Sequence, residues 1–314
     1  MTITQLPRYC FSSAIPEIII SGVTGTVNVS IEIGQETVFD EPLSPYGGQI
    51  KLYDVEELIK PVLEKYGADR LDIIAQDAEG DVEQAESEVY PCATDVGTSF
   101  DTFTSRHFLS LLGYRKLTGS RRTELLHIAG NYNSARAYCY YSDGSGEWVN
   151  LTSGGGNYYY STFNVSPDNF DKEVVGYNVY IDGRQISYEV DQHDHEITAE
   201  FQFKNSFGMT EYLYCIGTVE SNSSYDRSTV TINKKTVEYD NKETRSFKCD
   251  TGFVCPEMYD FVEDFFRSKS ISVKKGDRWI PVVLTECSTN FRNDDDAITR
   301  ATFTYTYAGN QNVL

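Results

Sequence analysis

The chain has 314 residues, long enough for two or three domains, and a formal net charge of −20 from 27 Lys and Arg against 47 Asp and Glu. This balance argues against nucleic acid as a partner, because binding a phosphate backbone needs a basic face, and it disfavours anionic membranes. The 23 Tyr and 17 Phe favour β-structure and a protein that works through surface contacts, although ordinary strand composition accounts for them equally well.

The N-terminal residues and the cysteines favour a cytosolic origin. Residues 1–5 lack the basic start and apolar core of a signal peptide, and no stretch approaches the ~18 apolar residues of a membrane span. The seven Cys are widely spread without CxxC spacing, which favours reduced core thiols over a disulfide framework or a zinc site. We therefore expect synthesis in a cytosol and no membrane insertion.

Residues 1–92 predict a first β-domain with one helix. Apolar and polar residues alternate over residues 23–33, which is the period of a strand with one buried face, and a hairpin follows. The pattern of residues 55–66 predicts an amphipathic helix, with Asp54 as its N-cap and Gly67 at its end. Two further strands lead to a boundary at the end of this segment.

Residues 93–200 predict a middle β-domain of short strands separated by glycine-rich turns. An Asp-Gly turn connects residues 177–181 to residues 186–190 as a tight hairpin. Two segments, at residues 108–112 and 123–127, fit either a strand or a helix. The spacing of strands and turns is typical of a sandwich or barrel.

Residues 201–314 predict a third β-domain with the second helix. A hairpin turns at residues 205–208, and two short strands at residues 229–232 and 236–239 flank another turn. The apolar residues of segment 256–267 form one wide face of a helix, and strands follow to the end of the chain. The whole chain is thus predicted to be mainly β, with two or three sandwich-like or barrel-like domains and two short amphipathic helices.

No set of residues predicts an active site. His193 and His195 lie on one side of a strand near a carboxylate and could bind a divalent metal. Structural metal sites use four ligands, however, and the sequence shows no other His/Cys cluster. No serine has a GxSxG context, the glycines at 154–156 lack the Lys-Ser/Thr of a phosphate loop, and the acidic run at 293–296 lacks EF-hand spacing. We therefore predict a non-enzymatic protein without metal or cofactor.

Aromatic residues of the middle segment are the candidate interaction residues, because exposed rings beside polar groups can stack on sugars or contact a partner chain. Tyr177 belongs to the same group, and alternation along the strand at residues 158–160 predicts that at least one side of it is core. We expect contacts from the loop at residues 143–160 and from the strand edges beside residues 205–208. The candidates are Trp148, Tyr158, Tyr159 and Tyr160 of the middle segment, together with Asn205 and Phe207 of the hairpin turn in the third segment.

Three segments share a further pattern: residues 26–31 leading to 48–58; residues 203–208 with Glu211 and 215–217, a strand, Asn-x-x-Gly, Glu, strand arrangement; and a helix at 261–270 followed by strands at 271–273, 280–282 and 301–308. Together they resemble virion proteins of tailed bacteriophages, particularly those that infect Bacteroidetes. The resemblance implies a tail or baseplate component of the virion, made in the host cytoplasm. Its implied partners are other virion subunits and copies of itself.

Two other classes of protein use similar strands and aromatic residues. A carbohydrate-binding or adhesin-like module would bind a host-surface glycan, but it must be exported, and the missing signal peptide argues against it. A glycan-cleaving enzyme needs two carboxylates at a defined separation across a cleft, and sequence spacing cannot identify such a pair among 47 acidic residues. We rank the enzyme last.

Overall fold

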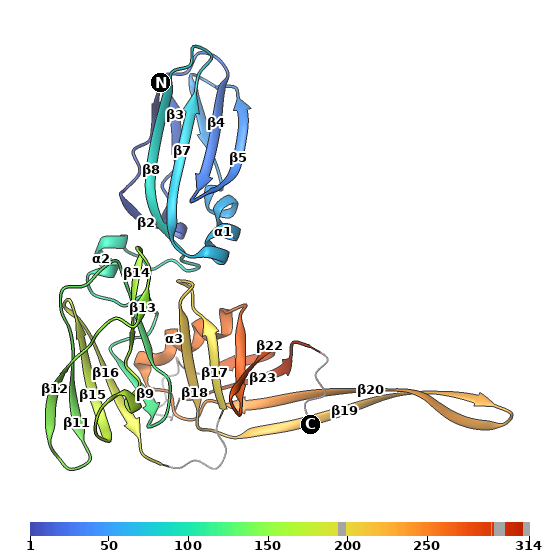
Figure 1. The fold of residues 1–314 in the computed structure, drawn as a ribbon. Coiled ribbons are helices and arrows are strands. Elements are labelled where there is room, and N and C mark those ends of the chain that lie inside the picture. Colours follow the sequence, from blue (N-terminus) through green and yellow to red (C-terminus); the bar gives the residue numbers. More distant parts are fainter. Residues whose placement is uncertain (194–198, 290, 292–298, 310–314) are drawn as a thin grey trace.

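The protein is mainly β, as predicted, in a computed structural model that describes residues 1–193, 199–289, 291 and 299–309. Within these residues the strands form five sheets, and the helices are few and short. An N-terminal pair of sheets lies at one end of the molecule, and the remaining sheets form a larger body from which a two-stranded arm projects (Figure 1).

The N-terminal sandwich is built from strands that each bury one face. In the strand at residues 27–33, Val27, Val29, Ile31 and Ile33 are buried while the residues between them face outward. The smaller sheet contains β1 (Thr2–Ile3), β3 (Ile18–Ser21) and β6 (Gln49–Leu52). The larger sheet contains β2 (Tyr9–Phe11), β8 (Val82–Tyr90), β7 (Asp69–Gln76), β4 (Val27–Ile33) and β5 (Glu36–Leu43).

The first predicted helix is confirmed as α1 (Val55–Tyr66), whose apolar face completes the core of the sandwich. Gly67 ends it with φ 86°, and its N–H donates to the carbonyl of Leu63 over 2.9 Å. The predicted capping by Asp54 is wrong in its details. Asp54 has a left-handed φ of 55° and its side chain makes no capping hydrogen bond.

The middle segment forms a five-stranded and a three-stranded sheet. The predicted hairpin is confirmed, with positive φ at Asp182 (45°) and Gly183 (86°), as a tight two-residue turn requires. Of the two ambiguous segments, one contributes a strand and the other is irregular, and α2 (Phe100–Thr104) was not predicted. The strands are β12 (Gly146–Asn150), β11 (Ala135–Tyr141), β15 (Val174–Ile181), β16 (Arg184–Asp191) and β9 (Arg115–Gly119), then β10 (Leu125–Ala129), β14 (Tyr160–Asn164) and β13 (Gly155–Gly156).

The C-terminal segment forms a seven-stranded sheet with one helix packed on it. The predicted helix begins with a 3-10 turn (Pro256–Met258) and continues as α3 (Tyr259–Arg267). Phe261 and Phe265 of α3 lie against the sheet, each 5.3–5.5 Å from the ring of Phe203. The strands in sheet order are β18 (Thr210–Cys215), β17 (Ala199–Lys204), β21 (Ile271–Lys275), β22 (Arg278–Thr289), β23 (Ala301–Tyr307), β20 (Lys235–Asp250) and β19 (Val219–Ile232).

The last hairpin is much longer than predicted. Strands β19 and β20 pair continuously from Val219 opposite Cys249 to Ile232 opposite Lys235, whereas β20 contacts β23 only over its last four residues. The outer part, residues 222–246, is therefore a two-stranded ribbon that we call the arm. It was missed because neither of its faces is consistently apolar, so it lacks the alternation that marks a half-buried strand.

The described residues form three core clusters. One contains residues 6–89 of the N-terminal sandwich, which places the predicted boundary near residue 92 at the edge of a core. A second cluster contains buried residues from both the middle and the C-terminal segments, such as Val179 and Phe201. The other predicted boundary, near residue 200, falls inside β17, so the separation of these segments as folding units stays a prediction.

The third cluster is the junction between the N-terminal sandwich and the body. Phe11 of β2 lies between three rings, at 5.0 Å from Phe100, 5.5 Å from Phe103 and 5.6 Å from Phe207. These rings come from the sandwich, from α2 and from the turn after β17. Edge and offset contacts at these separations are favourable beyond simple burial, so this aromatic cluster fixes the sandwich to the body.

We predict that Phe207→Ala lowers the free energy of unfolding by roughly 3 kcal/mol or more, because it leaves a cavity between Phe11 and Phe103. Chemical denaturation followed by circular dichroism measures the change. Tyr46→Ala is the matched control, since the Tyr46 side chain is 95% exposed. A loss no larger than that of the control would contradict the role given to the junction.

Candidate functional site

The outward face of the middle five-stranded sheet carries a group of aromatic side chains. Along β11 the residues Ala137, Cys139 and Tyr141 point into the core, so Tyr138 and Tyr140 between them point outward. Trp148 on the edge strand β12 pairs with Tyr138, and Tyr180 on β15 reaches the same face. We call Tyr138, Tyr140, Trp148 and Tyr180 the aromatic platform.

The four rings of the aromatic platform contact one another. The ring of Tyr138 lies 5.1 Å from that of Tyr140 and 5.1 Å from that of Trp148, and Trp148 lies 5.5 Å from Tyr180. Arg136 places its guanidinium carbon 4.2 Å from the Trp148 ring centre. Trp148 is nevertheless 51% exposed and Tyr140 45% exposed, so the group is accessible from solvent. Large exposed apolar groups that are rimmed by polar residues mark interaction sites.

The shape of the aromatic platform limits what it can bind. Successive ring planes are inclined by 51° to 77°, so the rings do not form one flat surface. The guanidinium of Arg136 lies over Trp148. A sugar ring stacks best on an uncovered flat aromatic face, whereas an uneven surface of tyrosine, tryptophan and arginine suits a protein partner.

Sequence reasoning found only one member of the aromatic platform, Trp148. The alternation of residues 135–141, with buried small residues between large polar aromatic ones, is the signal that would have identified Tyr138 and Tyr140. Tyr180 and Arg136 join the site only through strand pairing, since Arg136 lies opposite Tyr180 in the β11–β15 register.

The other aromatic candidates lie elsewhere. Tyr158 is 68% exposed at the turn before β14, but Tyr159 packs edge-on against Tyr90, and its hydroxyl donates to Asp69 Oδ1 over 3.1 Å. Tyr160 belongs to β14 and is half-buried beside the junction. Tyr177 is buried and stacks on another tyrosine inside the core. The structure therefore separates Trp148 from residues 158–160.

Asn205 and Phe207 are buried within the chain, so the structure gives them an internal role in place of the expected exposed contact. The Asn205 side-chain oxygen accepts from the N–H groups of Phe207 and Met209, over 3.0 and 2.9 Å, and so fixes the turn between β17 and β18. Its amide donates to the carbonyl of Leu109 over 2.8 Å. This correction follows from long-range packing that local sequence does not reveal.

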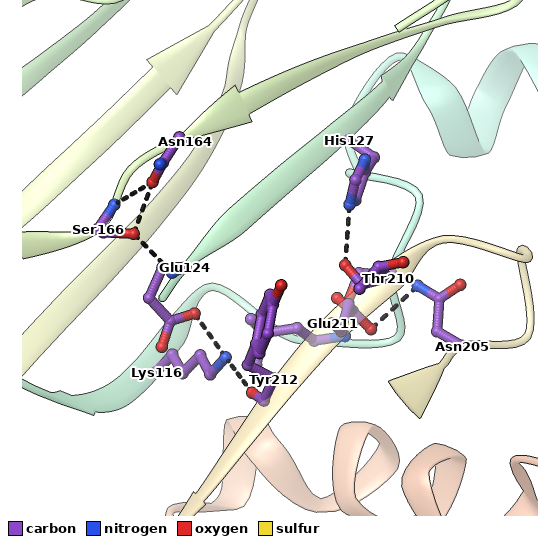
Figure 2. A network of polar contacts seen from close by, with 11 residues as sticks. Lys116, Glu124, His127, Asn164, Ser166, Asn205, Thr210, Glu211 and Tyr212 are labelled. Atoms are coloured by element: carbon purple, nitrogen blue, oxygen red, sulfur yellow. Dashed lines mark hydrogen bonds and ion pairs between the residues drawn. The ribbon is translucent and has the colours of Figure 1, made fainter. Parts of the chain in front are cut away.

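A buried polar network connects the middle sheets to β18, as Figure 2 shows. Lys116 Nζ contacts Glu124 Oε2 at 2.6 Å and donates to the carbonyl of Tyr212 over 2.8 Å. His127 Nε2 lies 3.0 Å from the carbonyl of Thr210. Buried charges of this kind require such partners, because an isolated charge in the core is strongly destabilising.

Burial shifts the pKa of several groups beside these contacts, among them His127 and Glu211. Burial lowers the pKa of His127 to about 4, which keeps the imidazole neutral, and burial raises the pKa of Glu211 to about 7. Groups with a perturbed pKa often mark active sites, but Glu124 and Glu211 are each less than 5% exposed. The contacts that they make are consistent with a structural role.

That His193 and His195 bind no metal stays a prediction. Nδ1 of His193 lies 2.8 Å from Asp191 Oδ1, while His195 and residues 293–296 lie outside the described residues. Within the described part of the chain no group of three or more His, Cys, Asp or Glu is arranged to hold a metal ion. Nor does any helix there have the length and apolar character needed to cross a bilayer.

Comparisons with known proteins do not identify a family. No family model matches the chain, and no curated protein matches it. Solved structures give matches with low overall similarity. A chimeric titin Z1Z2 is 11% identical with a TM-score of 0.17, covering 62% of this chain and 97% of its own.

Two bacterial proteins give comparable matches. A Ca2+-stabilised adhesin with which an Antarctic bacterium binds ice is 10% identical with a TM-score of 0.17, covering 80% of this chain and 68% of its own. The second is SGBP-B of a Bacteroides ovatus mixed-linkage glucan utilisation locus, in complex with a mixed-linkage heptasaccharide. It is 12% identical with a TM-score of 0.15, covering 76% of this chain and 65% of its own. At these TM-scores the matches carry no argument about function.

We predict that Glu211→Gln stabilises the protein more at pH 8 than at pH 5. Because the folded-state pKa of Glu211 is raised from 4.5 to about 7, the folded state binds more protons than the unfolded state between these values. The contribution of Glu211 to the free energy of unfolding therefore falls as pH rises through this window.

The free energy of unfolding of Glu211→Gln, relative to that of wild type, should rise by roughly 1–3 kcal/mol from pH 5 to pH 8. Urea denaturation at each pH measures it. Removal of one exposed carboxylate, Glu79→Gln, is the control. A difference that does not change with pH would show that Glu211 is not held in its protonated form.

Proposed function

We propose that this protein is a non-enzymatic structural subunit of a tailed-bacteriophage particle, of tail or baseplate type, that acts by contacting other subunits. The observation that carries the proposal is the aromatic platform, an exposed group of tyrosine and tryptophan on a rigid sheet. Tyrosine, tryptophan and arginine are the residues most enriched where protein interfaces derive their binding energy. The assignment to a phage particle rests on the resemblance of the three sequence segments.

Rigidity supports a role for the aromatic platform in assembly. The strands that carry it bury their other face in the core shared with the C-terminal sheet, so the rings are held before any partner arrives. Holding side chains in place before binding reduces the entropy lost on association. A surface of this kind suits a permanent contact between subunits.

A second candidate function is carbohydrate binding at the same place. Trp148 remains half-exposed, and an indole beside polar groups can stack on a sugar. The inclined rings and the position of Arg136 over Trp148 favour a protein partner instead. The two candidates differ in what they need, since a glycan requires one open ring face while a protein surface can cover all four rings.

We predict that Trp148→Ala with Tyr180→Ala lowers incorporation of the chain into particles by about 10-fold or more, because interface anchors of this type contribute ~2 kcal/mol or more each. Quantitative mass spectrometry of purified particles measures the copies incorporated. Tyr46→Ala, which removes an exposed ring from the N-terminal sandwich, is the matched control. Absence of the wild-type chain from purified particles would end the proposal.

Carbohydrate binding has its own readout. The chain contains two tryptophans, so Trp279→Phe leaves Trp148 as the single indole. Titration of this variant with host-surface oligosaccharides should leave its fluorescence unchanged if the platform serves only protein contacts. A saturable change that disappears on Trp148→Phe would favour the glycan-binding function.

A further inference from the structure

The described residues of the body give the arm little support. Between Glu220 and Lys248 no side chain is buried, and only the last four residues of β20 pair with a third strand. Its eleven residue pairs, from Asn222 opposite Ser246 to Ile232 opposite Lys235, span about 35 Å at the usual rise per residue. A two-stranded hairpin is only marginally stable in water by itself, so an arm of this length is suited to being held by a partner.

The two faces of the arm differ. On one face the polar side chains satisfy each other across the strands, with Arg227 Nη1 3.1 Å from Glu238 Oε2 and the Tyr225 hydroxyl 3.3 Å from Glu243. On the other face, near the tip, Val230 pairs with Val237 and Ile232 follows on the same side. These three apolar side chains are 41–55% exposed. The tip therefore presents an apolar patch that is exposed among the described residues.

The turn at the tip places one lysine in an unfavourable backbone conformation. Asn233 and Lys234 have φ of 53° and 62°, the left-handed pair of a tight hairpin turn. The usual sequence there is Asn-Gly, because glycine adopts positive φ without steric strain, whereas lysine does not. Lys234 thus places a positive charge at the apex despite this strain, and Lys235, the first residue of β20, adds a second charge beside it.

Charge is unevenly distributed along the chain. The arm carries five Lys and Arg against four Asp and Glu, in a protein of net charge −20. Residues 1–92 carry 17 Asp and Glu against 5 Lys and Arg, which is more than half of the excess negative charge. Four of those five cations already have carboxylate partners within the sandwich, at 2.5–3.7 Å. The acidic sandwich therefore keeps a large excess of negative charge after its own ion pairs are formed.

The turn between β7 and β8 concentrates this negative charge. Asp77, Glu79, Asp81 and Glu83 have no ion pair with any Lys or Arg among the described residues, and Val82 beside them is 55% exposed. An acidic turn with an exposed apolar side chain complements a tip that is cationic and apolar. The arm and the sandwich extend in different directions from the body, so this match joins two molecules (Figure 1).

We propose that the arm tip of one copy of this protein docks on the acidic N-terminal sandwich of a second copy. The contact pairs two different surfaces, so each copy both donates an arm and accepts one, and such head-to-tail contacts generate rings or filaments. Opposite charges at the two surfaces also steer the copies together. The inference does not depend on which particle contains the chain.

The test uses the purified full-length chain in sedimentation velocity over a range of concentrations and salt. Wild type should form assemblies that grow with concentration and shorten at high salt, where charge is screened. Lys234→Glu with Lys235→Glu should weaken self-association at least about 10-fold, because it places like charges in contact. Adding Glu79→Lys and Glu83→Lys to the same chain should restore association.

Two controls separate contact from folding. Arg106→Glu with Arg121→Glu makes the same change in net charge on exposed residues of the body and should leave assembly as in wild type. Lys234→Gly removes one tip charge while giving the turn its preferred Asn-Gly sequence, so it should weaken assembly without unfolding the arm.

Mixing distinguishes head-to-tail docking from pairing of two arms. A copy with reversed tip lysines can still accept an arm, so equal amounts of it should shorten wild-type assemblies. Arm-to-arm pairing would instead leave the size of the wild-type assemblies unchanged in this mixture. It would also leave self-association unchanged in the variant Glu79→Lys with Glu83→Lys. Either result overturns the proposal. A wild-type chain that stays monomeric at all concentrations overturns it as well.

Discussion

Burial of one face of every sheet is the constraint from which the rest of this structure follows. A strand of period two can place its apolar residues on one side only, so each sheet needs a second layer, which the body supplies by packing the middle sheet, the C-terminal sheet and α3 around one core. The opposite faces are then free for other residues. Tyr138, Trp148 and Tyr180 occupy such a free face, and the arm contains no buried side chain on either face among the described residues.

An element of the fold could be predicted where the local sequence pattern alone determines which of its residues are buried. The alternation of residues 27–33, the apolar stripe of α1 and the Asp182-Gly183 turn are local signals, and each predicted its element correctly. The arm lacks such a signal because both of its faces meet solvent. Asn205 was placed among the exposed candidates because its burial depends on residues about a hundred positions away, such as Leu109, which no local pattern reveals.

Polar groups in the core explain why the body holds one arrangement. Replacing a buried ion pair by apolar residues is often neutral for stability, so Lys116 and Glu124 are weak evidence of stabilisation. Their contribution is to fix how the sheets are placed. Lys116 also binds the backbone of β18, and His127 meets the backbone at Thr210, so only one placement of the middle sheets against the C-terminal sheet satisfies both contacts. The aromatic platform, carried on the far side of that sheet, takes its position from them.

The register of the arm shifts between Ser228 and Thr229, where β20 contributes one extra residue. A bulge of this kind sharpens the right-handed twist of a strand pair, so the outer third of the arm is rotated about its long axis relative to the part nearest the body. The direction in which Val230 and Val237 point is therefore set by one inserted residue and by no contact with the core. Moving that insertion by a few positions would re-aim the tip while every residue of the body kept its neighbours. The orientation of this surface can thus change in evolution independently of the fold that carries it.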